Sequence, residues 1–339
     1  MTISVLLQSR SLAPLALMAL ALVSVAQPAS GLTLEQLLNE PYFDRSDIEA
    51  VRDGEFGVAR IHEISDREIA VAIACLIQVP SEEALAPFLG DSLPVDETHL
   101  LDQRMIDPEA PAASFQAIVL DRDHRKEIRH FREAHPGFGL NLSADEIAAF
   151  RALQDADSAA VEATLENILH TRYRAYRESG LAGAIPYARD DGKAVNPGEE
   201  LRRTEEAMTG LHELYPEFHN AWLRYPASIP DDVVGDDYFW LKLDIEDLPA
   251  FVLSHRLEAK NDDMHLVGIR DYYMSHFLDV SQRAAVVTRI DTGQDILIYI
   301  ERAWVDYWTG MASLKKKIGR KVLTTQMEHL LEEHGICGR

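Results

Sequence analysis

Five segments of strand character follow one another between residues 237 and 302, joined by connections that are too short for anything but hairpins. They are Phe239–Leu243, Phe251–Ala259, Met264–Leu278, Arg283–Ile290 and Asp295–Arg302. The connections 260–263 and 291–294 contain the Asn, Asp and Gly residues that favour tight turns. Parallel neighbours would need crossovers of a dozen or more residues. The sequence therefore predicts an antiparallel meander.

Two further strands are predicted upstream. Phe56–Ile64 alternates between apolar and polar residues, and Arg67–Val79 is almost wholly apolar and rich in Ile and Val. Pro80 ends the second strand, and Ser81 is a suitable N-cap for a helix that runs to Leu89. A third segment, 114–120, is also predicted as a strand.

Helical patterns fill the middle and the end of the chain. Ser143–Glu146 is a capping box, Val161–Tyr176 has apolar residues at helical spacing, and Glu199–Leu214 is also predicted as helix. A long final helix with a broad apolar stripe is predicted over Ala303–Glu333. The predicted fold class is α+β: a curved antiparallel sheet packed on a long C-terminal helix, with a helical insertion.

This order of elements resembles the helix-grip fold of the START-like lipid-binding superfamily. The stretches IACLIQVPSEEALAPFL and ILIYIERAWVDYWTG…LKKKIGRKV carry the resemblance. It implies a sheet that grips the final helix around a cavity for an apolar ligand. It also implies an N-terminal part of the domain (27–110), a helical insertion (111–230), and the meander with the C-terminal helix (231–339). Residues 1–26 precede the domain and are interpreted below as a signal peptide.

The first 26 residues have the pattern of an export signal. Arg10 precedes an apolar stretch that ends near Val25, and small residues lead to Ala26 before the polar Gln27. We expect cleavage near Ala26 and a periplasmic or secreted protein. A retained membrane anchor is the alternative, although the run is short and interrupted by Pro14.

Composition excludes several classes of protein. The chain has 339 residues, is 47% hydrophobic and carries a formal net charge of −23. A disordered chain would be poorer in apolar residues, a transporter would have several apolar runs, and a nucleic-acid-binding protein needs a basic face.

The two cysteines are interpreted separately. Cys75 lies in an apolar run and is expected to be a buried, inert thiol, whereas Cys337 is expected to be mobile because it lies near the chain end. The sequence indicates no framework of disulfides.

Strong catalytic motifs are missing from the sequence. It contains no P-loop, no G-x-S-x-G elbow, no H-E-x-x-H and no G-x-G-x-x-G. Asp and His residues cluster within 121–135, but the interleaved Arg and Lys residues indicate a solvated charged helix. We expect no metal and no cofactor, and we assign no catalytic residue.

Ligand-binding candidates come from the meander and the final helix. With a period of two, Arg270, Tyr272, Met274, His276 and Leu278 share one face of their strand. If that face lines the cavity, Tyr272 and His276 contact a head group and Arg270 holds an anion. The ligand-binding candidates are Arg270, Tyr272, His276, His255, Tyr299, Trp304 and Trp308.

A basic cluster on the final helix suggests a second surface. Lys315, Lys316, Lys317, Arg320 and Lys321 lie close together on an otherwise acidic chain. Such a cluster attracts anionic lipid head groups, so contact with a membrane surface is predicted.

Three functions remain open. The preferred one is an exported protein that binds or carries an apolar or amphipathic ligand between sheet and helix. The second is a secreted hydrolase or lyase that uses His276, His255 and a carboxylate. The third is a periplasmic structural or interaction protein whose insertion 111–230 docks a partner.

Overall fold

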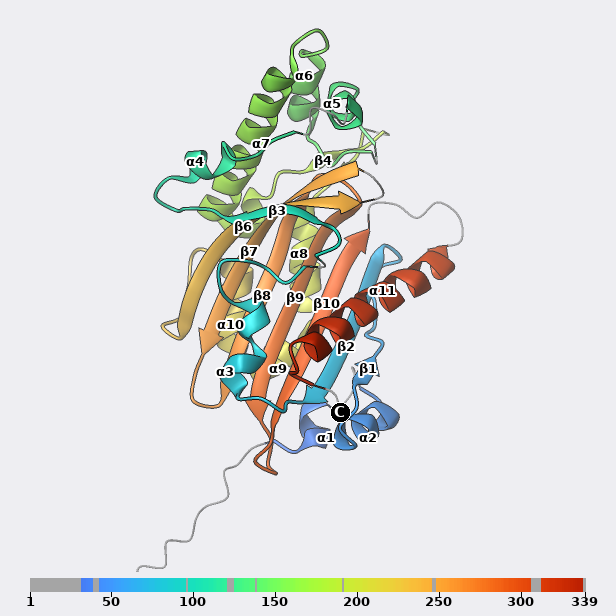
Figure 1. Ribbon diagram of the computed structural model, residues 1–339, viewed down its shortest axis with the longest axis vertical. Coiled ribbons are helices and arrows are strands. Elements are labelled where there is room, and N and C mark those ends of the chain that lie inside the picture. The colour runs from blue at the N-terminus through green and yellow to red at the C-terminus, as the bar shows by residue number, and fades with distance from the viewer. Residues whose placement is uncertain are drawn as a thin grey trace, which may run out of the picture. The chain divides into compact units, whose positions relative to one another are not determined.

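A computed structural model gives the fold (Figure 1). It describes residues 32–38, 43–95, 97–120, 125–137, 139–190, 192–245, 248–305 and 312–337. The predicted signal peptide and Trp308 lie outside these residues. Residues 31–339 form one compact unit.

The predicted antiparallel meander is confirmed and forms most of one sheet. Its strands are β6 (Val233–Ile245), β7 (Leu248–Lys260), β8 (Met264–Met274), β9 (Leu278–Arg289) and β10 (Asp295–Val305). Earlier in the chain come β1 (Gly57–Ala59), β2 (Glu68–Leu76) and β3 (Leu100–Met105). The strand order is β1-β2-β10-β9-β8-β7-β6-β3, and all neighbours are antiparallel.

The pairing of β2 with β10 places the first long strand of the sheet beside its last strand. The register runs from Leu76 opposite Ile296 to Glu68 opposite Trp304. Within it, the Arg302 Nε donates to the Glu68 carboxylate over 2.8 Å, and both side chains are fully buried. Strands separated by more than 200 residues are thereby held in register.

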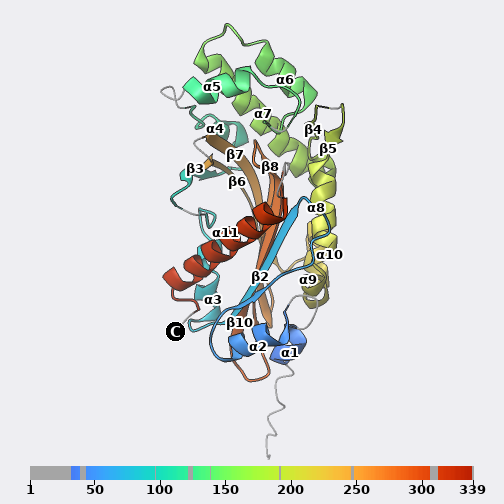
Figure 2. The same cartoon turned by 90° about the vertical axis from the view of Figure 1, so that its right-hand side faces the viewer.

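Helices cover both faces of the sheet, as Figure 2 shows. One face, which we call the α7 face, packs against helices from the middle of the chain. The other, the α11 face, packs against α3 (Ser81–Ala84), the 3₁₀ helix η1 (Ala86–Phe88) and α11 (Ala312–Glu333). The α-helices between β3 and β6 are α4 (Pro111–Phe115), α5 (Arg125–Arg132), α6 (Ala144–Arg151), α7 (Ser158–Ser179), α8 (Pro197–Glu206), α9 (Thr209–Leu214) and α10 (Pro216–Arg224).

Small elements complete the fold. They are α1 (Leu34–Leu37), α2 (Arg45–Arg52), the 3₁₀ helix η2 (Gly180–Gly183), and the two-stranded sheet of β4 (Tyr187–Ala188) and β5 (Ala194–Val195). None of the described helices is long and apolar enough to cross a membrane.

Local signals explain the helices that were predicted correctly. The Ser143 hydroxyl accepts from the Glu146 backbone N–H while the Glu146 side chain accepts from the Ser143 N–H, which is the expected capping box. In α7 the apolar stripe is buried, including Leu165, Leu169 and Tyr173. Amphipathic spacing thus fixed both the position of α7 and the side that meets the sheet.

Several predicted boundaries were wrong. The segment 114–120 is not a strand: Pro111 occupies the first turn of α4, where its missing N–H costs nothing. The predicted helix over Glu199–Leu214 is divided into α8 and α9. The final helix begins at Ala312 rather than Ala303, because Trp304 and its neighbours pair with both β2 and β9.

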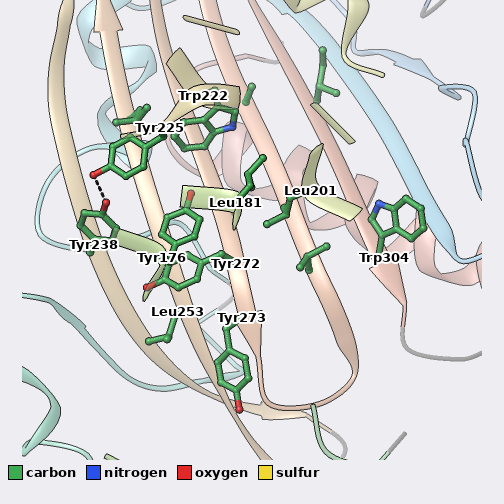
Figure 3. Packing of buried hydrophobic residues seen from close by; sticks show 14 of the residues in the cluster. Tyr176, Leu181, Leu201, Trp222, Tyr225, Tyr238, Leu253, Tyr272, Tyr273 and Trp304 are labelled. Carbon is green, nitrogen blue, oxygen red and sulfur yellow. Dashed lines mark hydrogen bonds between the residues drawn. The ribbon is translucent and has the colours of Figure 1, made fainter. Parts of the chain in front are cut away.

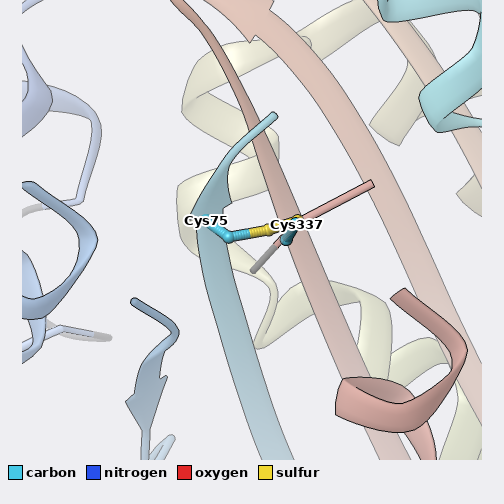
Figure 4. The surroundings of a disulfide bond; sticks show 2 residues. All are labelled: Cys75 and Cys337. Carbon is cyan, nitrogen blue, oxygen red and sulfur yellow. A yellow bond between two sulfur atoms is a disulfide. The ribbon is translucent and has the colours of Figure 1, made fainter. Parts of the chain in front are cut away.

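The prediction for the cysteines was also wrong. Cys75 on β2 and Cys337, which follows α11, form a disulfide (Figure 4). Cys337 is buried rather than mobile, and the two cysteines are 262 residues apart in sequence. Disulfides persist in oxidising, extracytoplasmic compartments, so the bond is consistent with an exported protein.

One close backbone approach gives a test of the helical layer. A Cβ on Gly198, in the first turn of α8, would lie 1.9 Å from the Leu181 carbonyl oxygen of η2. We expect Gly198→Ala to lower the free energy of unfolding by about 2 kcal/mol or more, despite the better helix propensity of Ala. Urea unfolding monitored by circular dichroism measures this.

Gly139→Ala is the matched control, because the nearest atom to its Cβ would be 3.8 Å away. We expect its stability to stay within about 0.5 kcal/mol of wild type. Equal stability of the two variants would contradict this packing of α8 on η2.

Candidate functional site

A groove runs between α11 and the segment that links η1 to β3. Its volume is about 1050 Å³, and residues 86–103 form one wall while residues 321–334 of α11 and its end form the other. The apolar part of the lining includes Leu89, Leu93, Val95, Val322 and Leu330; the polar part includes His99, Lys321 and His329. The lining therefore mixes apolar side chains with polar and charged ones, and a concave surface of this kind is a candidate small-molecule site.

A polar stripe crosses the α11 face of the sheet. Asp271 on β8 accepts hydrogen bonds from Ser254 on β7 and Ser281 on β9, and from the Arg283 guanidinium over 3.2 Å. Arg283 lies opposite Glu301 of β10 in the sheet register. We call Ser254, Asp271, Ser281, Arg283 and Glu301 the polar stripe. It spans four neighbouring strands.

Tyr299, one of the predicted ligand contacts, lies next to this stripe. Its hydroxyl donates to the Glu301 carboxylate over 2.6 Å, and its ring lies 6.0 Å from that of Phe88. Burial raises the pKa of Glu301, although the nearby Arg283 opposes this effect. The Arg283 Nε is buried and has no hydrogen-bond partner among the residues that the structure describes. The stripe therefore contains a donor that its own members do not use.

Sequence reasoning missed the polar stripe, although a signal was present. Ser281 and Arg283 are two positions apart on β9, and Glu301 interrupts the apolar run of β10. Polar residues that fall on one face by a period of two are a sign of a shared polar surface.

Three of the predicted ligand contacts do meet, but on the α7 face. Arg270, Tyr272 and His255 surround Tyr176 of α7: the Tyr272 ring stacks on the Tyr176 ring at 3.9 Å, as Figure 3 shows. The Arg270 guanidinium donates to the Tyr176 hydroxyl over 3.1 Å. All these side chains are buried beneath the helices.

His255 is held between a tyrosine and an acid. Its Nδ1 lies 3.1 Å from the Tyr176 hydroxyl and its Nε2 lies 3.0 Å from the Asp236 carboxylate. The hydroxyl of Tyr225 also donates to Asp236, and Tyr238 donates to Tyr225. Burial lowers the pKa of His255, and the hydrogen bond to Asp236 opposes that effect.

Arg270 is a buried cation whose direct hydrogen-bond partners are neutral. It donates to the Gln282 side chain over 2.9 Å and to the Trp222 carbonyl over 3.1 Å, and its guanidinium lies 4.2 Å from the Trp222 ring centre. Gln282 in turn donates to the buried Glu205. The charge of Arg270 thus fixes α7 and α10 to the sheet through cation–π and hydrogen-bond contacts.

A β-bulge explains why the period-two prediction failed in β8. The pairing with β7 shifts between Tyr273 opposite Leu253 and Asp271 opposite Ser254. Tyr272 and Tyr273 therefore both pack in the α7-face cluster, whereas Met274 belongs to the α11-face cluster. One extra residue reverses the alternation beyond it.

The remaining candidates are dispersed. His276 lies after β8 ends, and its ring is 6.1 Å from that of His130 on α5. Trp304 is on the α7 face, where its indole donates to Thr204 of α8 over 2.7 Å. His255 and His276 therefore lie in separate sets of contacts. Whether these residues bind a ligand stays a prediction.

The basic cluster of α11 is partly neutralised. Lys316 and Arg320 both form ion pairs with Glu63, at 3.0 Å and 2.7 Å. Lys317 and Lys321 are exposed, and so are Ile318 and Val322 beside them, at 54% and 48%. The side chain of Lys315 lies outside the described residues.

Within the described residues, no three His, Cys, Asp or Glu side chains gather closely enough to hold a metal ion. In the charged segment 121–135, residues 121–124 lie outside the described part, and His130 contacts the Gly139 carbonyl at 3.1 Å. Comparisons with family models, curated proteins and solved structures find no match to this chain.

His276 makes the stability of the fold depend on pH. Burial, with a smaller contribution from the adjacent His130, lowers its pKa to about 4. In the unfolded chain His276 takes up a proton near pH 6.5, but in the folded protein it does so only near pH 4. The stabilisation by neutral, buried His276 is therefore complete above pH 6.5 and is lost as the pH falls towards about 4. We expect the stability advantage of wild type over His276→Gln to shrink by about 3 kcal/mol between pH 7 and pH 4.

Urea unfolding at several pH values measures this difference. His329→Gln, which changes an exposed histidine, is the control and should follow the wild-type pH profile. A constant difference between wild type and His276→Gln over this range would contradict the burial of His276.

Proposed function

We propose that this protein binds and carries an apolar or amphipathic small molecule on the α11 face of a START-like helix-grip domain, outside the cytoplasm. The groove between α11 and residues 86–103 is the observation that carries the proposal. Its volume of about 1050 Å³ is at the upper end of the usual range for small-molecule sites.

The arrangement of elements supports this assignment. The short helices that follow β2 and the long helix that follows β10 cover the same face of one antiparallel sheet. This is the arrangement that the resemblance to the helix-grip fold implies, with residues 111–230 as an insertion on the opposite face.

The groove lining supports an amphipathic ligand rather than a purely apolar one. Leu89, Leu93 and Leu330 line it together with the polar side chains of His99 and His329. A ligand with an apolar body and a polar end can contact both kinds of side chain.

The other two functions have weaker support. For a hydrolase or lyase, His255 does meet the Asp236 carboxylate, but His255 is fully buried and shares no contact with His276. For an interaction module, the large exposed apolar side chains described within 111–230 are Val119 and Ile229 alone.

Native mass spectrometry of protein purified without detergent tests whether a ligand co-purifies with the protein. Binding of an amphipathic fluorescent dye tests whether the groove is the binding site. Thr325 lines the groove, so Thr325→Trp should fill it and weaken dye binding at least tenfold, which corresponds to about 1.4 kcal/mol. Displacement of the dye by the co-purified ligand would link the two measurements.

Glu332→Trp is the matched control, because this exposed α11 residue lies outside the groove lining. It should bind the dye as wild type does. The proposal fails if wild type carries no ligand and shows no saturable dye binding, or if Thr325→Trp binds as tightly as the control.

We further propose that the exposed part of α11 contacts anionic membrane surfaces, from which such a ligand is taken. Lys317 and Lys321 flank Ile318 and Val322 on the outer side of α11, and Lys321 and Val322 also line the groove. Exposed lysines next to aliphatic side chains suit a weak, salt-sensitive contact with acidic lipids.

Vesicle flotation measures this contact. Wild type should bind vesicles of phosphatidylcholine with phosphatidylglycerol more than vesicles of phosphatidylcholine alone, and Lys317→Glu/Lys321→Glu should lose at least four-fifths of the difference. Lys126→Glu/Lys260→Glu makes the same change in net charge at two exposed lysines elsewhere and should bind as wild type does. Equal binding by both double variants would remove the proposal.

A further inference from the structure

We propose that the Cys75–Cys337 disulfide is a latch that completes the ligand groove, so that oxidation of these two cysteines is a maturation step for binding. This inference rests on the proposed function, since it concerns the regulation of the same groove. We use the term C-terminal latch for the disulfide together with Ile336.

The first argument is that few apolar side chains attach the second half of α11. Among the α11 side chains that the structure describes, 316–333, Lys316, Met327 and Leu331 are buried, and Leu330 packs partly buried against the same cluster. So small an apolar contact is a weak attachment for a helix of 22 residues.

The second argument is that the two ends of α11 are attached by different means. Near its start, Lys316 and Arg320 pair with Glu63, and Gly319 lets the helix lie close to Ile69 of β2. Beyond its end, the backbone N–H of Gln78 donates to the Ile336 carbonyl over 3.0 Å, next to the disulfide. The C-terminal latch is therefore the attachment on the groove side.

The third argument is the position of the groove wall. Residues 321–334 of the wall lie between the Glu63 ion pairs and Cys337. A segment held only at its start opens by local unfolding, while the rest of the domain stays folded. Without the disulfide, this wall of the groove would be lost but the sheet would remain.

The chemistry of closure is a thiol oxidation. Joining the two Sγ atoms releases two protons and two electrons. The disulfide of an oxidising enzyme accepts these two protons and two electrons and is reduced to two thiols. Cys75 and Cys337 are 2% and 5% exposed in the folded protein, so the bond is shielded once it has formed. The latch thus acts during assembly in an oxidising compartment.

Hydrogen exchange measured by mass spectrometry tests the latch without any ligand. In Cys75→Ser/Cys337→Ser, peptides from 320–337 should exchange at least tenfold faster than in oxidised wild type, while peptides from β8 to β10 should keep their protection. Cys75→Ala/Cys337→Ala should behave in the same way, which excludes an effect of two new buried hydroxyls. Lys316→Gln, which removes one ion pair at the other attachment, should change exchange in 320–337 less than threefold.

Dye binding then connects the latch to the groove, and both double variants should bind at least tenfold more weakly than wild type. Exchange in 320–337 within twofold of wild type would overturn the proposal. Loss of protection throughout the sheet would overturn it as well, because the bond would then hold the whole fold. If α11 is released but wild type binds no amphiphile, the latch stands and the proposed function fails.

Discussion

The antiparallel pairing of β2 with β10 is the constraint on which the rest of the structure depends. It places the first long strand beside the last, so the helices that follow each of them cover the same face of the sheet. The buried pair of Arg302 and Glu68 fixes the register. A slip of β2 by one residue would turn Glu68 to the opposite face and leave the buried Arg302 without its partner.

The two faces of the sheet differ in how firmly they are covered. On the α7 face, Arg270, His255 and Tyr176 form a buried hydrogen-bonded network with α7 and α10, which makes that face rigid and closed. On the α11 face a single long helix is held by ion pairs near one end and a disulfide beyond the other. A thinly attached layer beside a groove is the part of a domain most suited to admit a ligand.

Much of the fold could be predicted, because the meander, the capping box of α6 and the apolar stripe of α7 are local patterns. The candidate site could be predicted only in part. Arg270 and Tyr272 were expected to share a strand face with Met274, but the bulge in β8 reversed the alternation, so that Tyr273 lies on their side and Met274 on the other. Residues 91–103, which line the groove, have no regular pattern in the sequence.

The sequence by itself determined the strands of the meander, their hairpin order and the class of fold, since alternation and turn residues act over a few positions. Only the tertiary structure decided that Cys75 meets Cys337 and that Lys316 and Arg320 are neutralised by Glu63. It also decided that Arg270, Tyr272 and His255 face the middle helices, whereas Tyr299 lies on the α11 face. Each of these depends on contacts between residues far apart in the chain. Which partner a side chain meets there is set by register, bulges and layer order, and these follow from the packing of the whole domain.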